Sequence, residues 1–127
     1  QGVLTGKYLP DAPPPAGSRA TDDKGGARMI ERFMRPEVLT AVQRLRPVAD
    51  ELGVTMAQLA LAWVLHNDNV AAALVGASRP EQVAENVKAI DVQLTPEVLT
   101  RIDDALGEVV VRDPAMTAAN APATRPA

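Results

Sequence analysis

Apolar residues follow a helical spacing over most of the chain. Between positions 36 and 53 this spacing predicts a helix that Pro47 kinks or divides. A second helix is predicted at 56–66, with Thr55 as its N-cap. A third is predicted at 96–106, where proline opens the helix and an apolar stripe follows. These segments predict a largely helical chain.

The pattern changes at 70–75, where the apolar run VAAALV shows no alternation. Such a run predicts a short parallel strand covered on both faces. Gly76 is expected to turn the chain, and Ser78 is expected to cap a helix that has Pro80 in its first turn. A single strand cannot form a sheet, because its backbone N–H and C=O groups would have no partners. Either the chain lacks its partner strands, or it is a helical domain and the strand prediction is wrong.

The helix predicted after Ser78 has two distinct faces. Its apolar face carries Val83, Val87 and Ile90. A polar face carries Gln82, Glu85 and Asn86, and Arg79 stands one turn earlier at the helix mouth. Helix N-termini attract anions, so an arginine, an amide and a hydroxyl there suit a phosphate. Spacing alone favours the simpler alternative, a solvated polar face.

The two ends of the chain are irregular in composition. Positions 1–8 form a loop with two glycines, and 9–26 form a long Pro- and Gly-rich connection before a short helix at 28–34. We expect residues 1–107 to form the folded part and residues 108–127 to form a disordered tail.

Composition narrows the functional classes. The 127 residues, 46% of them apolar, suit one domain with a core. No cysteine and one histidine exclude thiolate chemistry and a histidine metal cluster. A net charge of −3 with 2% aromatic residues argues against nucleic acid binding. No apolar run nears the roughly 20 residues of a membrane span, so we expect a cytoplasmic protein without membrane insertion.

Three motifs together resemble one family. They are GASRPEQVAEN at 76–86, QGVLTGKY at 1–8 with a following SRA at 18–20, and TMAQLALAWVLHND at 55–68. In this order they resemble the aldo-keto reductases, in the branch with bacterial glyceraldehyde-phosphate reductases and potassium-channel β-subunits. The resemblance implies an α/β fold, the C-terminal third of a (β/α)8 TIM barrel, mostly helical here with one clear short strand. It also implies that Gln1 lies partway through a larger protein.

The resemblance assigns NADPH-binding roles around the predicted helix. Ser78 and Arg79 would hold the 2′-phosphate of NADPH, which NADH lacks. Gln82 would support that phosphate or the ribose, and Glu85 and Asn86 would contact the adenine edge. These implied contacts concern the same residues that the helix pattern marks as polar.

Further implied cofactor residues lie in the first loop and at the glycine turn. Lys7 would reach the pyrophosphate, and Arg19 would help to fold the long loop over the cofactor. Gly2 and Leu4 would line the cofactor. Several family members carry a lysine at or near the position of Gly76, so here the anion site depends more on Arg79.

The resemblance places the catalytic Asp, Tyr, Lys and His of the family upstream of this chain. Tyr8 is expected to pack and His66 to lie at a helix end, so neither is assigned a catalytic role, and no metal site is expected. The intact enzyme would reduce small aldehydes or ketones, whereas this portion alone would be inactive and prone to self-association. The alternatives are an NADPH-sensing subunit of the channel β-subunit type and a small helical interaction domain.

Overall fold

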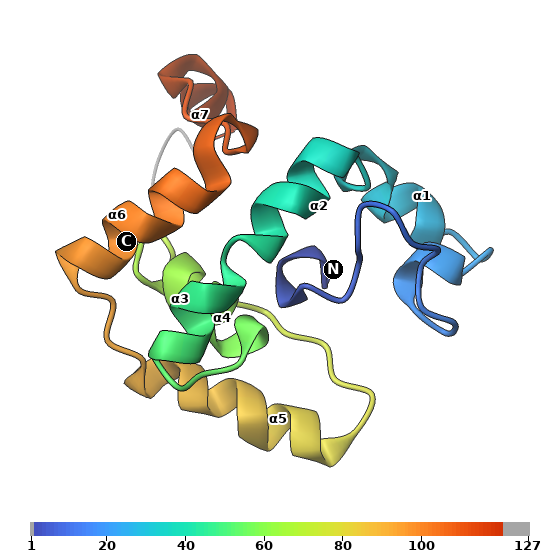
Figure 1. Ribbon diagram of the computed structural model, residues 1–127, viewed down its shortest axis with the longest axis horizontal. Helices are drawn as coiled ribbons and strands as arrows, with labels where there is room; N and C mark the ends of the chain where they lie inside the picture. Colours follow the sequence, from blue (N-terminus) through green and yellow to red (C-terminus); the bar gives the residue numbers. More distant parts are fainter. Residues whose placement is uncertain (1, 121–127) are drawn as a thin grey trace, which may run out of the picture.

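Helices form the regular structure of residues 2–120, the part of the chain that the computed structural model describes (Figure 1). The α-helices are α1 (Gly26–Ile30), α2 (Pro36–Gln43), α3 (Arg46–Glu51), α4 (Met56–Leu65), α5 (Pro80–Val87), α6 (Pro96–Leu106) and α7 (Pro114–Asn120). The 3-10 turns are η1 (Val3–Thr5), η2 (Arg19–Thr21), η3 (Glu31–Phe33), η4 (Lys88–Asp91) and η5 (Gly107–Val109).

The main core lies among α2, α3, α4 and α6. Its buried residues lie in these helices, apart from Leu45 between α2 and α3, and are Ala41, Val42, Leu45, Val48, Ala49, Met56, Leu59, Val98, Ile102, Ala105 and Leu106. The apolar stripe predicted for α6 is confirmed, because Val98, Ile102 and Leu106 are buried. Burial of this apolar surface provides the main favourable term for folding.

A smaller cluster attaches the first loop and α1 to α2. Tyr8, Ile30 and Leu39 are all buried in it. The expectation that Tyr8 packs is confirmed, since only 1% of the residue is exposed. The long loop is therefore anchored at both of its ends.

Caps and prolines define the helix boundaries largely as predicted. Pro47 stands in the first turn of α3, and the predicted helix divides there into α2 and α3. The Thr55 hydroxyl accepts a hydrogen bond from the Gln58 N–H at 3.2 Å, and the Gln58 amide oxygen accepts one from the Thr55 N–H at 2.9 Å. This reciprocal capping box confirms the predicted start of α4.

The strand predicted at 70–75 does not form in the structure. Positions 72–77 are irregular, and no strand occurs anywhere in residues 2–120. Leu74, expected to be buried, is 101% exposed. A strand requires a neighbouring backbone for its N–H and C=O groups, and residues 2–120 supply none. The segment is therefore irregular because it lacks a neighbouring strand, although its residues are apolar.

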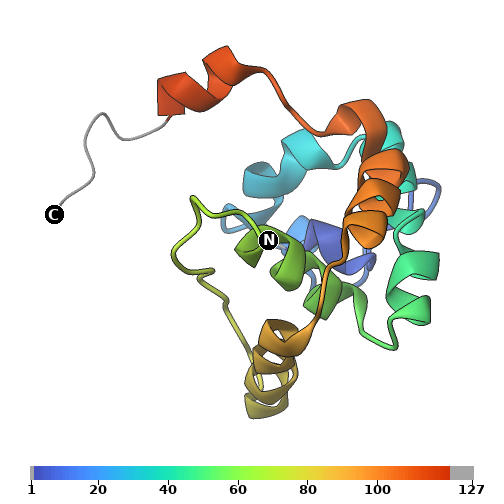
Figure 2. The same ribbon diagram turned by 90° about the vertical axis from the view of Figure 1, so that its left-hand side faces the viewer.

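The exposed segment leads into α5, whose apolar face is exposed as well. Val83 and Val87 are 50% and 55% exposed, and Ile90 in η4 is 68% exposed. The opposite side of α5 and the following turn pack against α4. Figures 1 and 2 both show the loop before α5 arching away from the helical core.

The segment after α6 contains η5 and α7. Val109 and Val110 pack against the main core, whereas Val111 is 71% exposed. Of the segment 108–127, for which a disordered tail is predicted, the structure forms η5 and the alanine-rich helix α7, which projects away from the core in Figure 2. Gln1 and residues 121–127 lie outside the described part.

None of the helices in residues 2–120 is by itself long and apolar enough to cross a membrane, although Pro36–Glu51 and Met56–Leu65, bent by 95°, meet that criterion as a pair.

Candidate functional site

The start of α5 is organised by the side chain of Gln82. Its amide oxygen accepts hydrogen bonds from the Ser78 N–H at 2.8 Å, the Ser78 hydroxyl at 3.2 Å and the Arg79 N–H at 3.2 Å. Arg79, in an extended conformation, is the N-cap residue. The predicted cap by Ser78 is therefore wrong by one position. The Ser78 hydroxyl donates to Gln82 and does not accept from the helix.

The Arg79 side chain extends from this ordered turn into solvent. The residue is exposed, and within residues 2–120 its guanidinium forms no ion pair. Pro80, the first residue of α5, has no N–H, so the anion-attracting end of the helix depends on the following amides and on Arg79. A cation without a partner at a helix N-terminus suits a phosphate.

Gly76 has a smaller structural role than the sequence predicts. Its φ angle is not positive, and a Cβ built there would meet no heavy atom within 4 Å. The expected sharp glycine turn is therefore not required, because the exposed loop allows the chain to reach α5 gradually. An exposed glycine still leaves room for a ligand to approach the backbone.

Glu85 is held by a residue that the sequence analysis did not assign to the site. Gln58 in α4 donates from its amide nitrogen to the Glu85 carbonyl at 2.9 Å and to the Glu85 carboxylate at 3.3 Å. The same carboxylate forms an ion pair with Lys88 at 2.7 Å. Asn86 is half-buried beside it. Glu85 is thus fixed in place, and the T-x-x-Q capping pattern was the only sequence signal for Gln58.

The first loop brings Gly2 and Lys7 together. Gly2 has a φ of +83°, and a Cβ there would lie 2.9 Å from both Cε and Nζ of Lys7. The Lys7 ammonium therefore lies across the Gly2 backbone, 5.2 Å from the centroid of the Tyr8 ring. Leu4 packs against the main core. The ammonium is exposed and has no carboxylate partner within the described part of the chain.

Arg19 opens η2, and this turn packs against α1. A Cβ on the buried Gly26 would lie 3.0 Å from Cγ of Arg19 and 2.4 Å from a carboxylate oxygen of Asp22. The absence of a side chain at Gly26 therefore allows η2 to lie directly on α1. Arg19 itself is exposed and forms no ion pair in residues 2–120.

The predicted site residues form two groups in the structure. One group belongs to the N-terminal loops and consists of Gly2, Leu4, Lys7 and Arg19. The other six residues lie in α5 or in the segment just before it. No hydrogen bond or ion pair within residues 2–120 joins the two groups.

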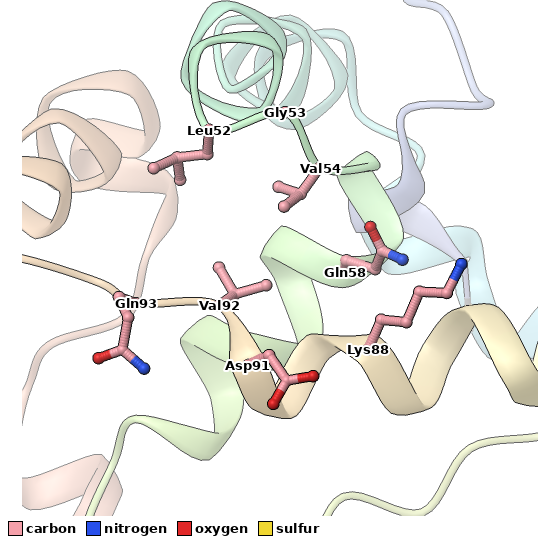
Figure 3. A pocket seen from close by; sticks show the side chains of 8 residues that line it. All are labelled: Leu52, Gly53, Val54, Gln58, Lys88, Asp91, Val92 and Gln93. Atoms are coloured by element: carbon pink, nitrogen blue, oxygen red, sulfur yellow. The ribbon is translucent and has the colours of Figure 1, made fainter.

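The main surface depressions lie away from most of these residues. One, of about 400 Å³, lies between the α3–α4 turn and η4, and Figure 3 shows Leu52, Val54 and Val92 among the side chains that line it. Gln58 and Lys88, the two partners of Glu85, stand at its edge. None of the ten predicted cofactor residues lines it. The depression is open to solvent, and it does not resemble an enclosed cofactor pocket.

Comparison with known sequences assigns the chain to a family. The aldo/keto reductase family profile matches residues 1–106. The chain belongs to the aldo/keto reductase family. This assignment confirms the resemblance seen in the motifs, and the family implies a (β/α)8 barrel fold, of which residues 2–120 show helices only.

Two aldo/keto reductase relatives illustrate the similarity. A probable voltage-gated potassium channel subunit beta from Arabidopsis thaliana is 45% identical over 107 residues, covering 83% of this chain and 32% of the relative. L-glyceraldehyde 3-phosphate reductase from Escherichia coli K12 is 37% identical over 110 residues, covering 85% and 31%. The chain spans about a third of the length of these relatives.

Proposed function

We propose that this chain supplies an NADPH-binding part of an aldo/keto reductase. The observation that carries the proposal is the arrangement around Gln82, whose amide oxygen accepts three hydrogen bonds from Ser78 and Arg79. These bonds order the turn at the start of α5 and leave the Arg79 guanidinium free for an anion. Family membership supports the same ligand.

The residues fit the cofactor in charge. NADPH carries a pyrophosphate and a 2′-phosphate, and the cations assigned to it are Lys7, Arg19 and Arg79. All three are exposed and lack an ion-pair partner within residues 2–120. Arg79 would take the 2′-phosphate together with the Ser78 hydroxyl, whose single O–H would turn from the Gln82 oxygen to the phosphate. Lys7 would take the pyrophosphate as a point charge.

The adenine would lie beside α5. Glu85 is already oriented by Gln58 and Lys88, so it would reach the adenine edge with little loss of conformational freedom. Gln82 would remain the organiser of the turn, while Asn86 would add an amide beside Glu85. Gly2, Leu4 and Gly76 would line the path of the cofactor, with Arg19 on the loop that covers it.

When bound, NADPH would supply a hydride for the carbonyl carbon of a small aldehyde or ketone. The residues of this chain bind and orient the cofactor, and we assign none of them to proton transfer. The residues that protonate the carbonyl would belong to the remainder of the barrel, so this chain alone is expected to be inactive. We expect the protein to be cytoplasmic and to self-associate through its exposed apolar surface.

Replacing Arg79 tests this function. In the natural full-length protein, Arg79→Ala is expected to weaken NADPH binding roughly tenfold or more and to leave NADH binding nearly unchanged, because only NADPH carries the 2′-phosphate. Fluorescence titration with each cofactor measures both dissociation constants. Arg44→Ala removes another exposed arginine and is the matched control. An unchanged preference for NADPH would remove Arg79 from the site.

A second candidate is an NADPH-sensing subunit, favoured by the 45% identity to the channel subunit beta. In that case occupancy by NADPH, not turnover, would be the function. The two candidates share the same binding site, so Arg79→Ala does not separate them. Measuring carbonyl reduction by the full-length protein at saturating NADPH does: steady turnover favours the reductase, and tight binding without turnover favours the sensor.

A further inference from the structure

Gln43, the last residue of α2, makes two long-range hydrogen bonds to the first loop. Its amide nitrogen donates to the Gly6 carbonyl at 3.0 Å and to the Tyr8 carbonyl at 3.1 Å. These two carbonyls belong to the residues on either side of Lys7. One side chain therefore fixes the backbone both before and after the lysine.

The orientation of this amide is set by a neighbour. Arg46 donates from a guanidinium nitrogen to the amide oxygen of Gln43 at 3.2 Å. Because a guanidinium can only donate, the oxygen must face Arg46 and the nitrogen must face the loop. Gln43 is half-buried, which limits the water that could replace it at the two carbonyls.

Gly6 completes the anchoring of the loop. It is buried with a φ of +73°, a conformation that favours glycine, and a Cβ there would lie 3.2 Å from Arg46 and 3.4 Å from the end of Met56. The loop is thus held closely against α3 and α4. In contrast, the Lys7 ammonium is exposed and crosses Gly2.

We propose that Gln43 is a positioning residue for Lys7: its amide fixes the backbone around the lysine and presents the ammonium to the cofactor pyrophosphate. This inference rests on the proposed function, since it takes Lys7 as a cofactor contact. A backbone that is already ordered loses less conformational freedom when the phosphate binds. Without the amide, the loop would have more conformations to lose on binding.

The test uses the natural full-length protein with Gln43→Met, which keeps the length of the side chain and its helix propensity but has no N–H donor. NADPH binding is expected to weaken roughly fivefold, corresponding to the loss of one or two hydrogen bonds. The KM for NADPH should rise while kcat is unchanged, because the reacting groups are not touched. Gln93→Met, at an exposed glutamine, is the matched control.

A double-mutant cycle distinguishes positioning from general stability. Lys7→Met is expected to weaken NADPH binding roughly tenfold. In that background Gln43→Met should have almost no further effect if Gln43 acts through Lys7. A further fivefold loss in the Lys7→Met background would overturn the proposal, as would wild-type affinity in Gln43→Met. Should Gln43→Met fail to fold, Gln43→Asn, too short to span both carbonyls, takes its place in the cycle.

Two other outcomes separate this inference from the proposed function. If Lys7→Met binds NADPH normally while Arg79→Ala does not, the result supports the cofactor site at α5 and contradicts the positioning role of Gln43. If the wild-type protein binds no NADPH, the proposed function itself fails, and the inference fails with it.

Discussion

Gln58 is a buried polar residue whose amide oxygen and amide nitrogen both form hydrogen bonds. It is 6% exposed, its oxygen accepts from the Thr55 N–H, and its nitrogen donates to the carbonyl and the carboxylate of Glu85. One amide therefore caps α4 and fastens α5 to it. A buried amide is stabilising only while its partners are present.

Gln58→Met is therefore expected to destabilise the protein by about 1–3 kcal/mol, because the Thr55 N–H loses its partner and the Glu85 carbonyl loses its donor. Urea unfolding measures the free-energy change. Gln93→Met, at an exposed glutamine, should lie within about 0.5 kcal/mol of the wild type. Equal stability of the two variants would show that the link between α4 and α5 contributes little.

Part of this residue-scale arrangement could be read from the sequence. The T-x-x-Q spacing marks Gln58 as a capping-box residue, because that interaction is local. Its bond to Glu85 spans 27 residues, as the bonds of Gln43 to the first loop span 35 and 37. Such long-range pairs depend on how the helices pack, and no local pattern encodes them.

At the scale of elements, the helices were predictable because their signals are local. Proline at the start, threonine caps and apolar spacing identify α2, α3, α4 and α6. The segment 70–75 was not predictable in the same way, since a strand exists only with a neighbouring strand. Its apolar composition indicates only that the segment can be buried. Residues 2–120 contain no strand with which it could pair.

The ion pair between Glu51 in α3 and Arg101 in α6 makes the contact between these two helices sensitive to pH. Glu51 binds Arg101 through two hydrogen bonds, one of them 2.7 Å long, and this lowers the pKa of the Glu51 carboxyl below its ordinary value. A carboxyl whose pKa is lower in the folded state adds stability above its unfolded pKa. That stability is lost as the pH falls through the folded-state pKa.

Glu51→Gln tests this contact. The urea midpoints of the wild type and the variant should differ slightly at neutral pH and converge in acid, because the exposed pair contributes only a small amount. Glu81→Gln, at an exposed carboxylate without an ion pair in residues 2–120, should show no such convergence. A wild-type and Glu51→Gln difference that persists in acid would contradict the assignment.

At the scale of the whole molecule, the family could be predicted from three motifs, whereas the spatial relation between the two groups of proposed cofactor residues could not. Each motif gives its own local geometry, such as the turn before α5 or the Lys7 loop. Their mutual placement depends on how distant segments are arranged, and no bond within residues 2–120 sets it. The chain also covers only about a third of the length of the two relatives compared above.

The unpaired segment before α5 has a consequence for proteolysis. Within residues 2–120, none of the backbone N–H groups at 71–77 donates a hydrogen bond, so these amides should exchange with solvent almost at once. A protease of broad specificity should therefore first cut this chain near Leu74, ahead of any helix. Mass spectrometry of a brief digest would identify the two products. Early cleavage elsewhere would show that 71–77 is protected.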